Sequence, residues 1–499
     1  MLLTSAFVAF SFLRLAISGP PSPESILGND SIQVYFQGEP GYQNASRAFN
    51  MRLDFEPLAV AFPNSTEEVA DLVKVGAQLG VPVNARSGGH SYAAYGLGGA
   101  DGHLIVDLSN IKDIHVDNST GVAVVGAGNR LGDVATALFD QAGRAIPHGL
   151  CPLVGLGGHA AFGGYGFTSR QWGLTLDNVI GATVVLADGT IVNASSTEQP
   201  DLFWALRGAA PSFGIITYYH FQTYVAPAQP TYFRYIWLLP LDEGIKGISA
   251  YQNFSFSPAI PKEIGFYMYI TKGVNRGDLN LTVFGSYYGE PDQYEAIIQP
   301  FLDAMPNTSL PAQINVTSWI DNLVLLGNGN ITSTPESRAS DSNTFYTKSI
   351  TTSPDTPLSE EAITAFANWL SVEGWYTDTN WFVELEFWGG NSSKIVQVPS
   401  NATAYYNRNE MWTIQFYTSS PDYEPPFPKE GFAFLDGLVA SITANEPDSY
   451  KYGAYPNYVD PRLPPSEWHE LYYGSNYDRL RQIKTQYDPN NVFMFPQSM

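Results

Sequence analysis

The chain has 499 residues, of which 44% are hydrophobic and 15% are charged, and its formal net charge is −23. This length predicts two or three domain-sized units, and this composition argues against wholesale disorder. The acidic excess argues against nucleic acid or an anionic membrane as a partner. Beyond the N-terminus, no stretch is long and apolar enough to span a bilayer, and we expect neither class of partner.

The N-terminus predicts entry into the secretory pathway. Residues 2–17 are apolar apart from Arg14, so residues 1–19 are typical of a signal peptide, although the first residues lack a positive charge. The alternative is an ordinary apolar N-terminus. About a dozen Asn-X-Ser/Thr sequons favour a secreted or secretory-pathway protein that is N-glycosylated. The chain has one cysteine, which excludes a disulfide framework.

Local patterns predict short strands and helices through the first 225 residues. Residues 20–50 are polar and rich in Pro and Gly, and we expect a surface lead-in. A capping box at Ser65 to Glu68 begins a helix that Gly80 ends. Further strands are expected over residues 81–85, 104–106, 122–125 and 214–224, helices over 131–138 and 201–206, and a hairpin with an Asp-Gly turn over 182–193.

The middle third of the chain has a different character. Aromatic residues alternate along expected strands, and helical patterns at residues 359–370 and 431–444 interrupt them. This order predicts an antiparallel sheet with helices on one face. The opposite face, rich in Tyr and Trp, either packs on another domain or covers a substrate site. The strands are expected near residues 233–237, 265–269, 284–288, 345–347 and 382–386.

Two glycine-rich stretches predict a ligand site. The first runs from Arg86 to Tyr92, and the second runs from Pro147 to His159 and continues through Gly163 to Gly166. Glycine permits close backbone approach, and successive backbone amides form a nest suited to phosphate. A lone cysteine is usually an inert buried residue, but Cys151 borders this cradle. Taken alone, His90 fits a turn histidine as well as a functional one.

A Rossmann fold is the alternative reading of the same glycines. Residues 126–132 and 155–160 both approach the dinucleotide-binding pattern. In the first stretch the third glycine is one place late. After the second we expect more glycine rather than a helix, so we disfavour a nicotinamide-type fold.

Together the two stretches resemble the PCMH-type FAD-binding domain of the vanillyl-alcohol-oxidase superfamily, and more narrowly its berberine-bridge-like and fungal oligosaccharide-oxidase branch. The likeness runs from about residue 55 to 224 and resumes near residue 452. It implies FAD attached by two covalent bonds, to His90 and Cys151, and no metal. The cofactor-binding residues that it implies are His90, Cys151, Arg86, Ser87, Gly88, Gly89, Ser91, Gly155, Gly157, Gly158, Gly164, Tyr165 and Gly166.

The fold class expected on this basis is α+β, with a two-part FAD-binding domain. The first part spans residues 20–226, and residues 447–499 return to it at the end of the chain. A substrate domain, residues 227–446, lies between them and contains the antiparallel sheet.

Catalytic residues are also implied by the resemblance. In that branch a tyrosine in an N-Y-x-D motif is the base, and Asn457 to Asp460 match it with Tyr458. Because tyrosine is a poor base at a pKa of about 10, a neighbour must accept its proton. The branch has an aspartate on a strand where this chain has Glu386. The alternatives are a core tyrosine and a solvated strand carboxylate.

The expected substrate-binding residues depart in part from the branch. Glu384 shares a strand face with Glu386, and two adjacent carboxylates can leave one of them protonated. Tyr92 and Gln415 match the sugar-binding pattern, whereas Tyr267 and Tyr269 replace an Arg/Glu pair. An aromatic pocket can stack on a sugar or on a planar organic molecule.

Three functions remain open from the sequence. The favoured one is an FAD-linked oxidase, expected to be a monomer, that transfers hydride from a small organic molecule such as a fungal secondary metabolite and is reoxidised by O2 to give H2O2. The second is an oligosaccharide oxidase that converts a reducing-end sugar to its lactone. The third is a flavin-free binding protein on the same scaffold, against which His90 and Cys151 argue.

Overall fold

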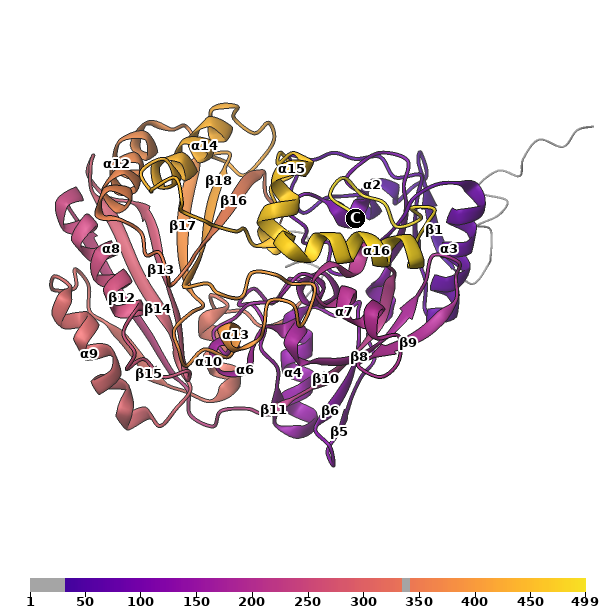
Figure 1. Ribbon diagram of the computed structural model, residues 1–499, viewed down its shortest axis with the longest axis horizontal. Helices are drawn as coiled ribbons and strands as arrows, with labels where there is room; N and C mark the ends of the chain where they lie inside the picture. The colour runs from indigo at the N-terminus through magenta and orange to yellow at the C-terminus, as the bar shows by residue number, and fades with distance from the viewer. Residues whose placement is uncertain (1–31, 334–341) are drawn as a thin grey trace, which may run out of the picture.

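The computed structural model describes residues 32–333 and 342–499, which form two parts side by side (Figure 1). The expected signal peptide lies outside the described residues. Helices and mainly antiparallel sheets together confirm the α+β fold class. The domain boundaries at residues 226 and 446 stay predictions.

The first part contains two main sheets and a two-stranded ribbon. One sheet has the strand order β1-β2-β4-β3, and the other, entirely antiparallel, has the order β5-β6-β10-β8-β9. The strands are β1 Gln33–Phe36, β2 Ala59–Phe62, β3 Val83–Arg86, β4 Leu104–Asp107, β5 Ile114–Asp117, β6 Val122–Gly126, β7 Arg144–Ala145, β8 Val179–Val185, β9 Ile191–Ser195, β10 Ile215–Gln222 and β11 Tyr224–Val225. The helices are α2 Tyr42–Ala45, α3 Thr66–Leu79, α4 Leu131–Ala142, α5 Leu156–Ala161, α6 Ser169–Trp172 and α7 Pro200–Ala209.

Helix α3 shows how local sequence sets these elements. The Ser65 hydroxyl accepts the Glu68 N–H at 3.2 Å, which satisfies a donor at the helix start. At the other end Gly80 adopts φ +67°, a left-handed conformation that ends helices. Between these residues, Val69 and Val73 are fully buried in the core of the first part, as their helical spacing predicts.

The second part is one antiparallel sheet of order β15-β12-β14-β13-β17-β18-β16. Helices α8, α9, α12 and α14 cover its outer face, and the other face turns toward the first part (Figure 1). The strands are β12 Thr231–Leu239, β13 Ile264–Lys272, β14 Leu279–Tyr287, β15 Gln313–Val316, β16 Phe345–Thr352, β17 Asn380–Phe387 and β18 Trp412–Ser419. The helices are α8 Leu241–Ser255, α9 Tyr294–Ala304, α10 Trp319–Leu326, α12 Glu360–Tyr376, α13 Lys394–Gln397 and α14 Glu430–Thr443.

Strand β17 separates the two faces of this sheet by its two-residue period. Val383 and Leu385 are buried among the side chains of the helices. Glu384 and Glu386 therefore point to the opposite face, toward the first part.

A buried arginine joins the two parts. Arg170 on α6 has no exposed surface, and its guanidinium donates to the backbone oxygens of Pro261, Ile264 and Gly389 at 2.7–3.0 Å. These acceptors lie just before β13, at its first residue, and after β17. The bonds thus hold α6 against the end of the sheet.

The last residues return to the first part, where α15 Pro465–Trp468 and α16 Tyr477–Tyr487 lie over it (Figure 1). The Val83 N–H on β3 donates to the Val492 oxygen at 2.8 Å. The buried Lys484 ammonium donates to the Ser212 oxygen at 2.8 Å and to Asp488 at 2.7 Å. Residues more than 400 positions apart in sequence thus share one core.

Two expectations about local structure are wrong. The lead-in is not all surface, because β1 pairs with β2 and Tyr42 on α2 is buried. The second glycine stretch does continue into a helix, α5, with Gly155 as its N-cap. Leu156 and Ala160 of α5 are buried in the core, and this packing outweighs the low helix propensity of the glycines.

Candidate functional site

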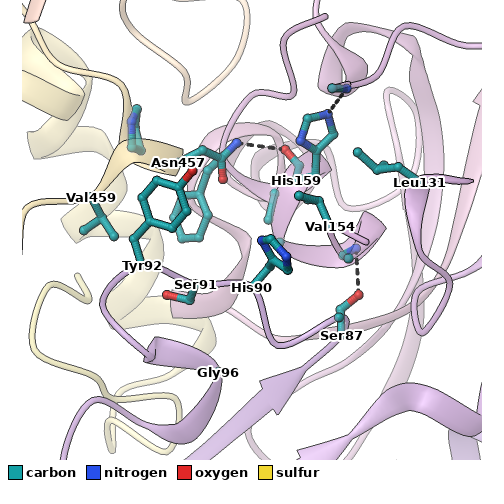
Figure 2. Close-up of a pocket in the computed structure, with 18 of the residues that line it drawn as sticks. Ser87, His90, Ser91, Tyr92, Gly96, Leu131, Val154, His159, Asn457 and Val459 are labelled. Atoms are coloured by element: carbon teal, nitrogen blue, oxygen red, sulfur yellow. Dashed lines mark hydrogen bonds between the residues drawn. The ribbon is translucent and has the colours of Figure 1, made fainter. Parts of the chain in front are cut away.

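A cavity of about 700 Å³ lies between the two parts of the molecule. Its walls come from both glycine-rich stretches, the inner face of β13, β17 and β18, and the 3₁₀ helix Pro456–Tyr458. Figure 2 shows His90, Tyr92, His159 and Asn457, from segments far apart in sequence, around this cavity. Cofactor and substrate sites occupy about 300–1,000 Å³, and this cavity has the size of such a site.

The first glycine-rich stretch leaves β3 at Arg86. The Arg86 guanidinium forms an ion pair with buried Asp107, so Arg86 fixes the start of the loop. Gly88 then packs against the second stretch, and a Cβ there would lie 2.4 Å from the Gly155 nitrogen. Gly89 follows with φ +74°, which favours glycine. Only glycine permits this backbone contact between the two loops.

Ser87 ties the same two loops together through its hydroxyl. The hydroxyl oxygen accepts the Gly157 N–H at 3.1 Å (Figure 2), and the O–H donates to the Ala127 oxygen at 2.6 Å. The Ser87 hydroxyl therefore uses its hydrogen bonds within the protein. Its role is to set the loop geometry.

The two residues expected to bond the cofactor, His90 and Cys151, both line the cavity. The Cys151 loop is held by His159, whose Nε2 accepts the Gly149 N–H at 3.1 Å (Figure 2). Burial lowers the pKa of His159 to about 3, so its imidazole is neutral and can accept this bond.

The cavity fits a phosphate-bearing cofactor. Within the described part of the chain, the backbone N–H groups of Gly89 and Ser91 find no hydrogen-bond acceptor. Gly158 borders open space, because a Cβ built there has no atom within 4 Å. Unused amides next to open space are what a bound pyrophosphate requires. Among the described residues, no group of three or more His, Cys, Asp or Glu could hold a metal ion.

Tyr458 and Glu386 meet on the cavity wall that β17 and the 3₁₀ helix Pro456–Tyr458 form. The Tyr458 hydroxyl donates to Glu386 Oε1 at 2.7 Å, and the Trp388 Nε1–H donates to Oε2 at 3.0 Å. Glu386 is 4% exposed, and burial raises its pKa to about 7, against the opposing effect of these two donors. Burial, followed by the Glu386 charge, raises the pKa of Tyr458. Glu386 can therefore take up a proton near neutral pH, whereas the raised pKa of Tyr458 keeps its hydroxyl protonated there.

The residues expected to bind substrate surround this pair. Burial, and then the charge of Glu386, raise the pKa of Glu384 to about 8. Gln415 donates from Nε2 to the Tyr92 hydroxyl at 3.2 Å. The Tyr92 ring stacks on Tyr458 with centroids 6.0 Å apart and planes at 9°. Polar groups and aromatic rings thus alternate along one wall.

Two predicted site residues lie outside the cavity lining. Gly164 instead donates its N–H to the Tyr455 hydroxyl at 2.9 Å. The ring of Tyr269 packs on Phe382 at 5.1 Å. The predicted residues that do line the cavity are Arg86, Ser87, Gly88, Gly89, His90, Ser91, Tyr92, Cys151, Gly155, Gly157, Gly158, Tyr165, Gly166, Tyr267, Glu384, Glu386, Gln415 and Tyr458.

Sequence reasoning missed residues that support the site. Trp388 lies two places after Glu386, and this same-face spacing could have indicated it. Tyr455, three places before Tyr458, accepts the N–H groups of Gly164 and Tyr165 at 2.9 and 3.2 Å. Its hydroxyl is therefore already engaged in holding the backbone of the second glycine stretch.

Comparison with known proteins agrees with this geometry. Residues 57–195 match the family described as "FAD binding domain", and residues 454–499 match "Berberine and berberine like". The chain is 37% identical to a carbohydrate oxidase of Microdochium nivale over 95% of this chain and 94% of that protein. It is 37% identical to a glucooligosaccharide oxidase of Sarocladium strictum over 95% and 93% of the two chains.

A solved structure extends the likeness to the fold. It is a glucooligosaccharide oxidase from Acremonium strictum, described by its 6-S-cysteinyl, 8α-N1-histidyl FAD. The TM-score is 0.87 at 35% identity, covering 96% of this chain and 99% of that chain.

The fold and the cavity define a flavin-dependent oxidoreductase. The chain belongs to the berberine-bridge-like family of the vanillyl-alcohol-oxidase superfamily and is an FAD-dependent oxidase. No helix in the described ranges is long and apolar enough to cross a membrane.

Proposed function

We propose that this protein oxidises the reducing end of an oligosaccharide to a lactone, with Tyr458 as the base and Glu386 as its proton acceptor. The observation that supports this most strongly is the 2.7 Å bond between Tyr458 and Glu386 on the wall of the cavity that His90 and Cys151 also line. A base beside the site of hydride loss is what alcohol oxidation requires.

Proton movement follows from this geometry. The bound flavin supplies the acceptor for the hydride that leaves the substrate carbon. The Tyr458 oxygen takes the proton of the substrate hydroxyl and passes its own proton to Glu386 Oε1. Because the pKa of Glu386 is about 7, its ionised form is available at neutral pH. Glu384, with a pKa of about 8, stays largely protonated there and can donate a hydrogen bond to a substrate hydroxyl.

We propose that FAD is bound through both His90 and Cys151. Both residues line the cavity, and the relative with the 6-S-cysteinyl, 8α-N1-histidyl FAD covers almost the whole chain. The unused amides of Gly89 and Ser91 would hold the phosphates. Molecular oxygen would take up the electrons and yield H2O2.

The proposed substrate class differs from the one that the sequence favoured. The sequence weakly favoured a small organic metabolite, because Tyr267 and Tyr269 replace an Arg/Glu pair. The relatives above are named carbohydrate and glucooligosaccharide oxidases, which supports the sugar reading better. The wall of Tyr92, Gln415 and Glu384 offers donors and acceptors for sugar hydroxyls.

A panel of gluco-, xylo- and chito-oligosaccharides, scored for H2O2 release, tests this proposal. We expect at least one series to give turnover and its lactone as product. If no sugar of the panel is turned over and a planar phenolic alcohol reduces the flavin, the result would support the metabolite reading instead. The aromatic lining, including Tyr267 and Phe382, is the observation that keeps this second candidate.

We also propose that the protein is secreted and glycosylated. The sequons at Asn118, Asn193, Asn391 and Asn401 lie on exposed residues, as glycan addition requires. A mass decrease after treatment of the native secreted protein with an N-glycosidase tests this. An unchanged mass would contradict it.

A further inference from the structure

A short segment between α2 and β2 crosses from one part of the molecule to the other. The Met51 N–H donates to the Asn343 oxygen at 2.8 Å, and the Asn343 N–H donates to the Phe49 oxygen at 3.0 Å. Asn343 leads into β16 of the second part. Residues 49–51 therefore form a strap between the N-terminal region and the large sheet.

The side chain of Phe49 covers one face of His90. The two rings are stacked, with centroids 3.8 Å apart and planes at 22°. The Phe49 ring also contacts two further aromatic rings, Phe345 at 5.5 Å, edge to face, and Tyr92 at 6.2 Å. The imidazole thus lies against an aromatic surface that the strap holds in place.

Asn50 anchors this arrangement. It is 1% exposed, and its Nδ2 donates to the Tyr92 oxygen at 2.8 Å and to the Phe345 oxygen at 3.1 Å. Its Oδ1 accepts the Phe345 N–H at 3.2 Å. One buried amide therefore joins the His90 loop to β16 and leaves Phe49 little freedom to move.

We propose that Phe49 is a positioning residue for covalent attachment of the flavin, because it sets the plane of the His90 imidazole. The inference rests on the proposed histidyl bond. An imidazole nitrogen reacts through a lone pair in the ring plane, so the bond forms only when that plane points at the flavin 8α-carbon. Restricting a reactant to the productive orientation raises the rate of bond formation.

Attachment of the His90 imidazole to the flavin needs no reactant other than oxygen. An N–C bond forms as the imidazole loses its N–H and the 8α-methyl loses one C–H. The two protons and two electrons stay with the flavin ring until dioxygen removes them as H2O2. Phe49 acts on the first step only, by orientation.

Truncation of Phe49 should remove the aromatic surface against which the imidazole stacks. Phe49 and His90 both line a second cavity of about 390 Å³ next to the loop, so Phe49→Ala would enlarge this space beside the ring. Phe62 lines the same cavity, but its ring packs edge to face on Tyr35 at 5.9 Å. Phe62→Ala is therefore a matched control.

The test uses the full chain in a Cys151→Ala background, where only His90 can bond the cofactor. Apoprotein is mixed with FAD, and the flavin that stays with acid-precipitated protein is followed in time. The flavin-bearing tryptic peptide is then identified by mass. We expect Phe49→Ala to slow attachment about tenfold or more, Phe49→Tyr to restore it, and Phe62→Ala to match the background.

Phe49→Leu keeps the volume without an aromatic face, and it replaces the alanine variant if that variant does not fold. Attachment by Phe49→Leu or Phe49→Ala at the background rate would overturn the inference. A background protein with no covalent flavin at all would instead contradict the histidyl bond itself, and with it the role of Phe49. The two failures are therefore distinguishable.

Discussion

Replacing Glu386 by glutamine should remove the pH dependence of the chemical step. With a pKa of about 7, Glu386 is about one-tenth ionised at pH 6 and about one-hundredth at pH 5, so kcat/KM of the wild type should fall roughly tenfold per pH unit below 7. This fall in kcat/KM is the acid limb of the pH profile, and in Glu386→Gln the acid limb should vanish. The remaining rate should lie about 10²–10⁴-fold below the wild-type plateau.

The assay is anaerobic stopped-flow reduction of the flavin, from pH 5 to pH 9, with the best oligosaccharide of the panel. Glu373→Gln, an exposed change of the same kind on α12, serves as the control and should leave the profile unchanged. A Glu386→Gln profile that keeps the limb near pH 7 at the wild-type rate would refute the assignment of Glu386 as proton acceptor.

The same variant should be more stable than the wild type at alkaline pH. A folded-state pKa of about 7 lies above the ordinary 4.5, so ionising Glu386 lowers stability as the pH rises through that interval. At ~1.36 kcal/mol per pKa unit the loss amounts to about 3 kcal/mol, which glutamine avoids. Thermal unfolding at pH 5 and pH 8 measures it. A wild type and variant that lose equal stability between these pH values would contradict the raised pKa.

Three further predictions concern the same site. Tyr458→Phe should lower the flavin reduction rate about 10²–10⁴-fold with little change in substrate affinity, and wild-type reduction by this variant would place the base elsewhere. Trp388→Phe removes a donor to Glu386, so the pKa of Glu386 and the acid limb should move to higher pH; an unmoved limb would show that the indole does not act on this carboxyl. His90→Ala and Cys151→Ala should each keep covalent flavin, whereas the double variant should release it on acid denaturation; release from either single variant would contradict attachment through both residues.

The residues proposed for the flavin site could be predicted from the sequence because they lie in continuous motifs. Both glycine stretches and the tyrosine motif occupy a few adjacent positions each, and the structure brings them to one cavity. The pairing of Glu386 with Tyr458 joins positions 72 apart, and only the resemblance to a family indicated it.

Other parts of the structure had no local signal. Phe49 contacts His90 across 41 positions of chain, and nothing in its neighbourhood marks it as a partner. Helix α5 forms although it contains two adjacent glycines, because burial of Leu156 and Ala160 decides its conformation. The Tyr269 ring packs on Phe382 and lies outside the cavity lining, which periodicity alone cannot show.

The return of the C-terminus to β3 has a consequence for biosynthesis. Chains emerge from the ribosome N-terminus first, and a domain normally folds as soon as its own residues are available. Here the Val83 N–H and the Asn84 side chain find their acceptors at Val492 and Met494, which are made only after the whole large sheet. The flavin-binding half must therefore wait, incomplete, while the whole large sheet is synthesised. Contacts of such long sequence separation also slow folding. Late completion of the flavin-binding part, rather than the chemistry of its site, should therefore limit the yield of active protein in a foreign host.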